Sequence, residues 1–197
     1  MVPTLPAPAH IAAIIPCYTD LGDSTRIITQ NGSIITFPTR LKGVVQKLAK
    51  SRAIDLVTLK ANTRLTTARK NMAPLPIAPG LVLVPLKVRK PRIAGDVTTG
   101  YVNLQAVSAV KASPHSSLQA TVTLIGGTKL PVLWSVDTVR RQLALARLSA
   151  SASPLSQPVA AAMFRENYPG YAPELLTLAV KLVDVFNEIL CIKQKQT

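Results

Sequence analysis

Side chains suited to catalysis are sparse in this sequence. The 197 residues include two histidines, His10 and His115, two cysteines and nine acidic residues. No pair of carboxylates has a spacing that suggests acid–base work, and no nucleophile, phosphate-binding or metal-ligand motif is present. Cys17 and Cys191 lie far apart, which is typical of free thiols in a reducing compartment. We therefore expect no catalytic residue, no metal, no cofactor and no enzymatic activity.

Basic side chains are abundant and unevenly placed. The chain has 23 Lys and Arg against nine Asp and Glu, a formal net charge of +14. Fourteen of the basic residues lie between Arg26 and Arg92, where Asp55 is the single acid. Such an excess attracts polyanions and says little about the fold. The alternative is an evenly solvated basic surface without a polyanionic partner.

The basic clusters supply the candidate contacts to nucleic acid. Arg and Lys side chains on loops and helix surfaces reach phosphate oxygens, and Arg also enters narrow minor grooves. For any single residue, a solvated side chain is the alternative. The clusters lie along a first expected helix, in a polar stretch expected to be a loop, after an apolar strand, and on a second helix. The cluster of the first helix is Arg40, Lys42, Lys47, Lys50 and Arg52, and that of the polar stretch is Arg64, Arg69 and Lys70. The cluster after the apolar strand is Lys87, Arg89, Lys90 and Arg92, and that of the second helix is Arg140 and Arg141.

The placement of aromatic residues and the absence of known DNA-binding motifs indicate which kind of nucleic acid to expect as a partner. One Trp, four Tyr and three Phe form no strip on which successive bases could stack. Neither a helix-turn-helix pattern nor a zinc finger is present. The sequence therefore favours a β-rich protein that contacts duplex backbone through basic loops and helices.

Two segments share the pattern of a β-hairpin followed by a helix. Residues 26–37 surround an Asn-Gly pair, which predicts a hairpin with a type I′ turn, and residues 41–48 have apolar side chains at helical spacing. Residues 121–132 surround a Gly-Gly pair, and helical spacing follows over 136–146. When the two segments are aligned, Gly32 matches Gly127. We interpret the repeat as an internal duplication; the alternative is chance agreement between two ordinary units.

The remaining segments complete the expected organisation. A run of small and Pro residues predicts a linker, and the apolar stripe from Leu175 to Leu190 predicts an amphipathic helix after it. No apolar run is long enough to span a membrane, and no leader peptide is apparent, so we expect a cytoplasmic, nucleoid-associated protein. The expected parts are an extended arm (1–10), a first β-rich unit (11–80), a second β-rich unit (81–149), a linker (150–162) and a C-terminal helix (163–197).

The second half of this pattern resembles a known family. An apolar strand ending in Pro over 81–85, the T-V-T-x-x-G-G-x-x-L-P-V segment at 121–132 and a Gln-containing helix over 135–143 follow one another as in ComK competence transcription factors. Residues 101–104 followed by 121–132 are also similar to the second half of a LytTR DNA-binding domain. The chain departs from LytTR domains at 97–98, where Val-Thr stands in place of His-Arg.

The resemblance implies an α+β, β-rich fold of two LytTR-like hairpin–helix units in tandem plus a C-terminal helix. It implies double-stranded DNA with AT-rich boxes as partner, a homodimer or higher oligomer, and activation of competence genes. Residues 163–169 are similar to the family's element for proteolytic adaptors, which implies an adaptor contact there. The alternative function is a ribosome- or RNA-associated basic structural protein. An enzyme acting on a polyanion is a third option, for which the sequence offers no cleft of His or carboxylate residues.

Overall fold

Nine strands and three α-helices make up the described part of the computed structural model, which comprises residues 3–20, 22–68, 71–113 and 118–152. The predicted α+β, β-rich class is confirmed. The strands are β1 (Ile11–Thr19), β2 (Gly22–Thr29), β3 (Ile34–Phe37), β4 (Leu75–Ala78), β5 (Leu81–Lys87), β6 (Thr99–Asn103), β7 (Val107–Ala112), β8 (Ala120–Leu124) and β9 (Lys129–Val132). The helices are α1 (Leu41–Lys50), α2 (Leu56–Thr67) and α3 (Val136–Ala152), with 3-10 turns at Pro8–His10 and Leu104–Ala106.

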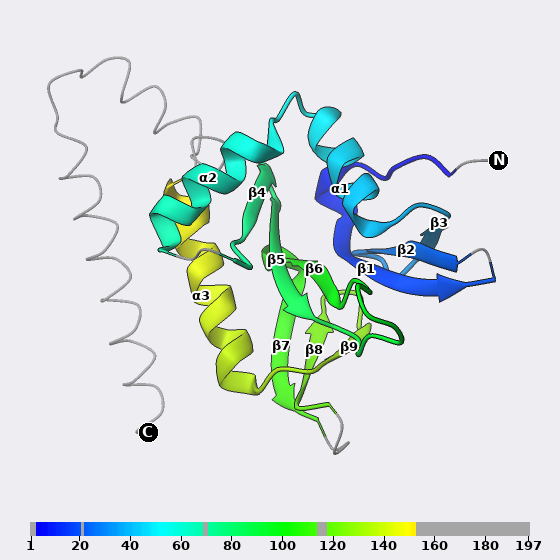
Figure 1. Ribbon diagram of the computed structural model, residues 1–197. Coiled ribbons are helices and arrows are strands. Elements are labelled where there is room, and N and C mark those ends of the chain that lie inside the picture. The colour runs from blue at the N-terminus through cyan, green and yellow to red at the C-terminus, as the bar shows by residue number, and fades with distance from the viewer. Residues whose placement is uncertain (1–2, 21, 69–70, 114–117, 153–197) are drawn as a thin grey trace, which may run out of the picture. The chain divides into compact units, whose positions relative to one another are not determined.

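A six-stranded antiparallel sheet of order β3-β2-β1-β6-β5-β4 lies at the centre of the described residues, and β7-β8-β9 form a second sheet (Figure 1). The central pairing joins distant parts of the chain, because Ala13 of β1 lies opposite Val102 of β6. The expected division into separate units at residues 80 and 81 was wrong. The β4–β5 hairpin spans it, and strands from both expected units share one sheet.

Both faces of the central sheet are buried. Successive strand residues point to opposite faces, and each face packs against other elements. Ile14 and its partner Ile27 pack against α1 and part of α2, and Ile11 joins them because the β1–β2 register shifts between Ile11 and Ala13. Ala13 and Val102 point to the other face, where β7–β9 and α3 pack. Figure 1 shows the two helices and the second sheet on opposite sides of the central strands. The near-continuous apolar runs of β1 and β5 follow from this double coverage.

The hairpin–helix order occurs twice, as β2-β3-α1 and as β8-β9-α3. The turns are equivalent, since Thr29 N donates to Ser33 O and Leu124 N donates to Thr128 O, both at 2.9 Å. Gly32 and Gly127 have φ of +85° and +76°. The type I′ assignment was wrong, because Gly is the turn's only residue with positive φ and more than two residues connect the strands. This geometry matches a type I turn closed by one left-handed glycine.

The two hairpin turns also touch each other. A Cβ on Gly126 would lie 2.5 Å from the carbonyl oxygen of Gln30 and 2.9 Å from the nitrogen of Gly32. Both neighbours are backbone atoms of the first turn, so they cannot rotate away as a side chain would. Gly126 is therefore required by this close approach, and Gly127 by its positive φ.

We expect Gly126→Ala to destabilise the fold by about 1–3 kcal/mol, because the added methyl forces two backbone segments apart. Urea unfolding followed by circular dichroism measures the effect. Ile125→Ala is the matched control, since Ile125 is its neighbour in the turn and 57% exposed. An unchanged unfolding midpoint for Gly126→Ala would show that the two turns do not pack as described.

Helix α2 occupies the polar stretch that was expected to be a loop, and that expectation was wrong. Asp55 caps its first turn by accepting hydrogen bonds from Val57 N at 3.1 Å and Thr58 N at 3.0 Å. The buried hydroxyl of Thr67 donates to the carbonyl of Thr63, which satisfies a polar group inside the core. Weak helix propensity and a weak apolar stripe concealed the helix, and an Asp at the N-cap was the available signal.

The described part of the C-terminal region ends with α3, at residue 152. Residues 150–152 belong to α3, so the expected linker begins later than residue 150. The rest of that linker, the C-terminal helix with its apolar stripe and the expected adaptor element lie outside the described residues. Among the helices that are described, none combines the length and apolar character needed to cross a bilayer.

Candidate functional site

Helix α1 has one apolar face and one basic face. Its N-cap residue is Arg40, and Arg52 follows its last turn. Lys42, Lys47 and Lys50 are exposed along the face that points away from the sheet. The opposite face packs on the sheet through Leu41, Val44, Val45, Leu48 and Ala49, all buried. Packing of the apolar face therefore fixes the direction in which the basic face points.

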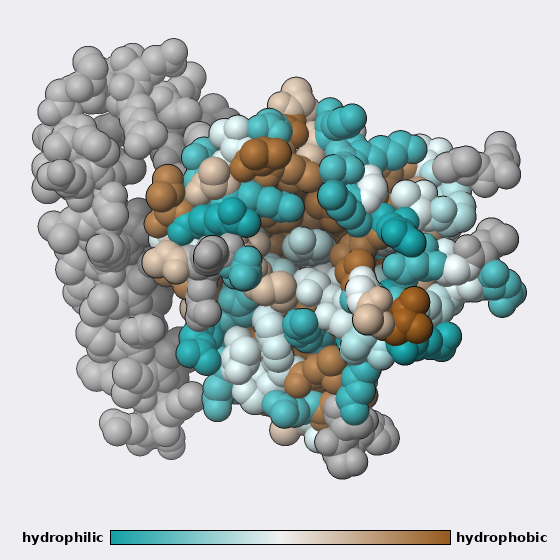
Figure 2. Space-filling view, in the orientation of Figure 1, coloured by the Kyte–Doolittle hydropathy of each residue, from teal (hydrophilic) through white to brown (hydrophobic). Residues whose placement is uncertain are grey.

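The cations of α1 have no carboxylate partner in the part of the chain that is described. The ion pair found there joins Arg89 to Asp23. Asp55 is the nearest acid in sequence, and its carboxylate is engaged at the N-cap of α2. The hydrogen bond from the Thr58 hydroxyl, followed by the backbone N–H bonds of Thr58 and Val57, lowers the pKa of Asp55. Hydrophilic residues gather over α1 in the space-filling view (Figure 2).

The loop between β5 and β6 is held by an aromatic and charged cluster around Tyr18. The guanidinium groups of Arg89 and Arg92 lie 3.9 Å and 4.1 Å from the centroid of the Tyr18 ring. Arg89 also donates from Nη2 to Asp23 at 2.6 Å and from Nε to the carbonyl of Val97 at 2.7 Å. Its side chain is 13% exposed. Arg89 thus stabilises the fold, and little of its guanidinium is open to a phosphate.

Asp96 closes the same loop. Its carboxylate accepts hydrogen bonds from the Tyr18 hydroxyl, from Arg92 N at 2.7 Å and from Ile93 N at 3.1 Å. The Tyr18 bond is the largest cause that lowers the pKa of Asp96, and the same bond raises the pKa of Tyr18. The loop is therefore fastened through an ionised carboxylate and a protonated phenol.

We expect Asp96→Asn to lower the thermal unfolding midpoint at pH 7. The folded-state pKa of Asp96 lies below the ordinary value of an Asp. At pH values above that ordinary pKa, the ionised carboxylate therefore stabilises the folded state. The stabilisation disappears as pH falls through the folded-state pKa, and the gap between variant and wild type should close there. Melting curves from pH 7 to pH 3 measure it, with Asp20→Asn, at an exposed position, as control. A gap independent of pH would contradict the role of the ionised carboxylate.

The other expected contact residues are spread over several surfaces. Lys87 donates from Nζ to the hydroxyl of Thr98 at 2.9 Å, and Lys90 is exposed. Arg140 and Arg141 are exposed on α3. The apolar residues of α3 pack on the face of the central sheet opposite to α1, so these two arginines do not join the α1 cations in one surface. Arg64 lies on α2, and Arg69 and Lys70 lie outside the described residues.

Comparisons with protein-family models, with curated proteins and with solved structures gave no match. Within the described ranges, no three His, Cys, Asp or Glu side chains come together as metal ligands would. The basic face of α1 is the largest set of expected contact residues that the structure brings to one element.

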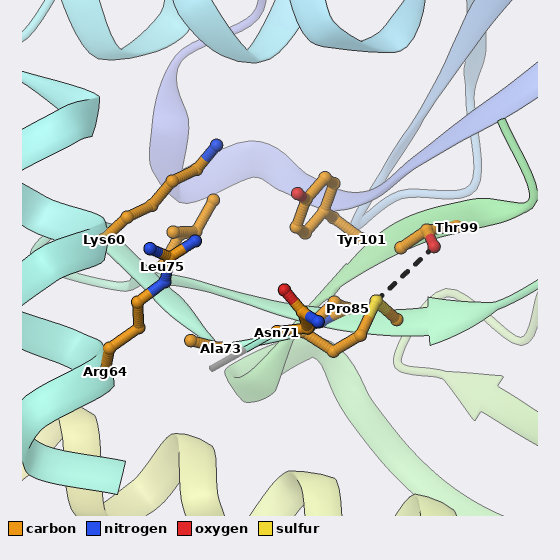
Figure 3. Close-up of a pocket in the computed structure, with 9 residues that line it drawn as sticks. Lys60, Arg64, Asn71, Ala73, Leu75, Pro85, Thr99 and Tyr101 are labelled. Carbon is orange, nitrogen blue, oxygen red and sulfur yellow. Dashed lines mark hydrogen bonds between the residues drawn. The ribbon is translucent and has the colours of Figure 1, made fainter. Parts of the chain in front are cut away.

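A cavity beside α2 was not expected from the sequence. It lies between α2 and the central sheet, and its lining includes Lys60, Arg64 and Tyr101 (Figure 3). Lys60 and Arg64 are four residues apart, the spacing that places two side chains on one helix face. That signal is informative only in a helix, and the sequence pattern predicts a loop over residues 62–70, which include Arg64.

Proposed function

We propose that this chain is a sequence-preferring, duplex-DNA-binding transcription regulator that acts in the cytoplasm at the nucleoid. The observation that supports it is the basic face of α1, which carries Lys42, Lys47 and Lys50, with Arg40 and Arg52 at its ends. A ten-residue helix is about 15 Å long, and the major groove of B-DNA is about 12 Å wide and admits a helix. In this proposal the five cations contact the phosphates along such a groove.

Duplex DNA is favoured over RNA for two reasons. The major groove of an RNA helix is deep and narrow, so a helix such as α1 cannot enter it. Recognition of single strands relies on exposed aromatic platforms, whereas the four aromatic side chains of the described residues, Tyr18, Phe37, Tyr101 and Trp134, are buried or half-buried. A ribosome- or RNA-associated role is the competing proposal.

The direct test is a fluorescence anisotropy titration on AT-rich and GC-rich duplexes, with a structured RNA hairpin as competitor. If about five phosphates are neutralised, log K should fall against log salt with a slope of roughly −4.5. We also expect a preference for the AT-rich duplex that persists at high salt, because an Arg that enters the narrow minor groove reads groove width independently of phosphate charge.

Three outcomes would contradict the proposal. A slope shallower than about −2 would mean that too few phosphates are engaged for a backbone reader. Equal affinity for both duplexes at every salt concentration would describe a polycation without sequence preference. Displacement of the duplex by an equal concentration of the RNA hairpin would favour the RNA-associated alternative.

A further inference from the structure

The cavity beside α2 has a volume of about 190 Å³ and a floor made by one face of the central sheet. Pro85 of β5 lies opposite Tyr101 of β6, and Thr99 is two residues from Tyr101 on the same strand. Residues two apart on a strand share a face, so these three side chains lie together. Leu75 of β4 extends the floor, and α2 forms the opposing wall (Figure 3).

The cavity opens where the β4–β5 ladder ends. Pairing between these strands reaches Leu75 opposite Leu83 and goes no further. The next residue before β4 is Pro74, and two residues after Leu83 comes Pro85. Neither proline has an N–H to donate to a further rung of this ladder.

Two exposed cations of α2 line one side of this space. Lys60 and Arg64 extend toward the side of the cavity where Tyr101 and Asn71 lie (Figure 3). Like charges four residues apart on a helix repel each other, which destabilises the unliganded helix slightly. No carboxylate lines the cavity, and neither cation forms an ion pair within the described residues. A bound anion would relieve this repulsion.

The other lining residues divide the cavity into a polar side and an apolar floor. Burial raises the pKa of Tyr101, so its phenol keeps the proton and can donate a hydrogen bond. The amide of Asn71 is a second uncharged donor. Ala73, Leu75 and Pro85 offer no polar side-chain atom. Such a combination of apolar surface with a few convergent polar groups is typical of small-molecule sites.

We propose that this cavity binds a small organic anion, a carboxylate or phosphate monoester with a compact apolar body. Lys60 and Arg64 contact the anionic group, Tyr101 donates a hydrogen bond to it, and the apolar body lies on Leu75 and Pro85. A volume of about 190 Å³ suits a small ligand. This site goes beyond the proposed function and does not depend on DNA binding.

Ligand-observed NMR on the full chain tests the proposal with benzoate and phenyl phosphate as probes. Benzamide is the neutral match for benzoate, and inorganic phosphate is the anion without an apolar body. We expect both organic anions to bind more tightly than benzamide or inorganic phosphate. The double variant Lys60→Gln/Arg64→Gln should weaken binding at least about tenfold, because two charge-assisted hydrogen bonds are removed. Tyr101→Phe should weaken it about threefold or more.

The control is Lys47→Gln/Lys50→Gln on α1, which makes the same charge change outside the cavity. An unchanged affinity in this control, with the weakening confined to the cavity variants, supports the site. An equal weakening in both double variants would mean that overall charge causes the loss of affinity, and would overturn the proposal. Equal binding of benzamide would overturn anion recognition, and equal binding of inorganic phosphate would overturn the apolar subsite. The absence of binding at about 10 mM of either organic anion would overturn the site itself.

Discussion

Replacing Lys42, Lys47 and Lys50 with Ala together is expected to weaken duplex binding about a hundredfold or more at low salt. This magnitude follows from roughly 1 kcal/mol for each phosphate interaction that the variant removes. The slope of log K against log salt should flatten by about one unit per phosphate released, roughly 2.7 in all. Ala has the highest helix propensity, and the three positions are exposed, so the variant should fold as wild type does.

Anisotropy titrations at several salt concentrations measure both quantities. The matched control removes three exposed cations elsewhere, as Lys111→Ala/Lys129→Ala/Arg147→Ala. These residues lie on β7, β9 and α3, away from the basic face of α1. The control should show only the smaller, general effect of net charge. An equal weakening in the two triple variants would mean that α1 makes no particular contact with DNA.

The second large effect is expected at Asn103, which is fully buried at the end of β6. Its Nδ2 donates to the carbonyls of Ile11 and Gly80, both at 2.9 Å. Its Oδ1 accepts from Val82 N at 3.4 Å and Gln105 N at 3.2 Å. One side chain thus joins β1, the β4–β5 turn, β5 and the turn after β6. Its removal leaves several buried backbone groups without a partner.

We expect Asn103→Ala to destabilise the fold by about 3–5 kcal/mol, because each unsatisfied buried group costs about 1–3 kcal/mol and the costs do not add fully. This is a large fraction of a typical stability of about 5–15 kcal/mol. Urea unfolding measures the change, with the exposed Asn62→Ala on α2 as control, expected to be within about 0.5 kcal/mol of wild type. A destabilisation below about 1 kcal/mol for Asn103→Ala would contradict the four hydrogen bonds.

The elements that the sequence predicts correctly are those whose information is local. The two hairpins have glycine turns between apolar runs, and α1 has five buried apolar residues on one helical face. Such patterns depend on neighbours within about one or two turns of chain. Helix α2 lacks a pattern of this kind: its Thr and Asn residues have low helix propensity, and the helix is held by its cap and by packing.

The candidate sites depend on contacts that no local pattern contains. The sequence groups Arg89 with three other cations, yet its ion-pair partner Asp23 lies 66 residues earlier in the chain. The cavity exists because Pro85 and Tyr101 come into register across two strands and α2 covers them. The same holds for the sheet as a whole, since the β1–β6 pairing has no signature in either strand. Tertiary pairing decides these features, and a single sequence does not reveal it.

The pairing of β1 with β6 has a consequence for how the protein is made. β1 is complete early in synthesis, but its central partner, around Val102, follows about ninety residues later. At about 5–20 residues per second, the ribosome needs roughly 5–18 s to supply it. During that interval β1 carries an unpaired, strongly apolar edge outside the ribosome, the kind of edge that other chains join. The long separation between β1 and β6 therefore makes this interval the one in which the nascent chain is most exposed to aggregation.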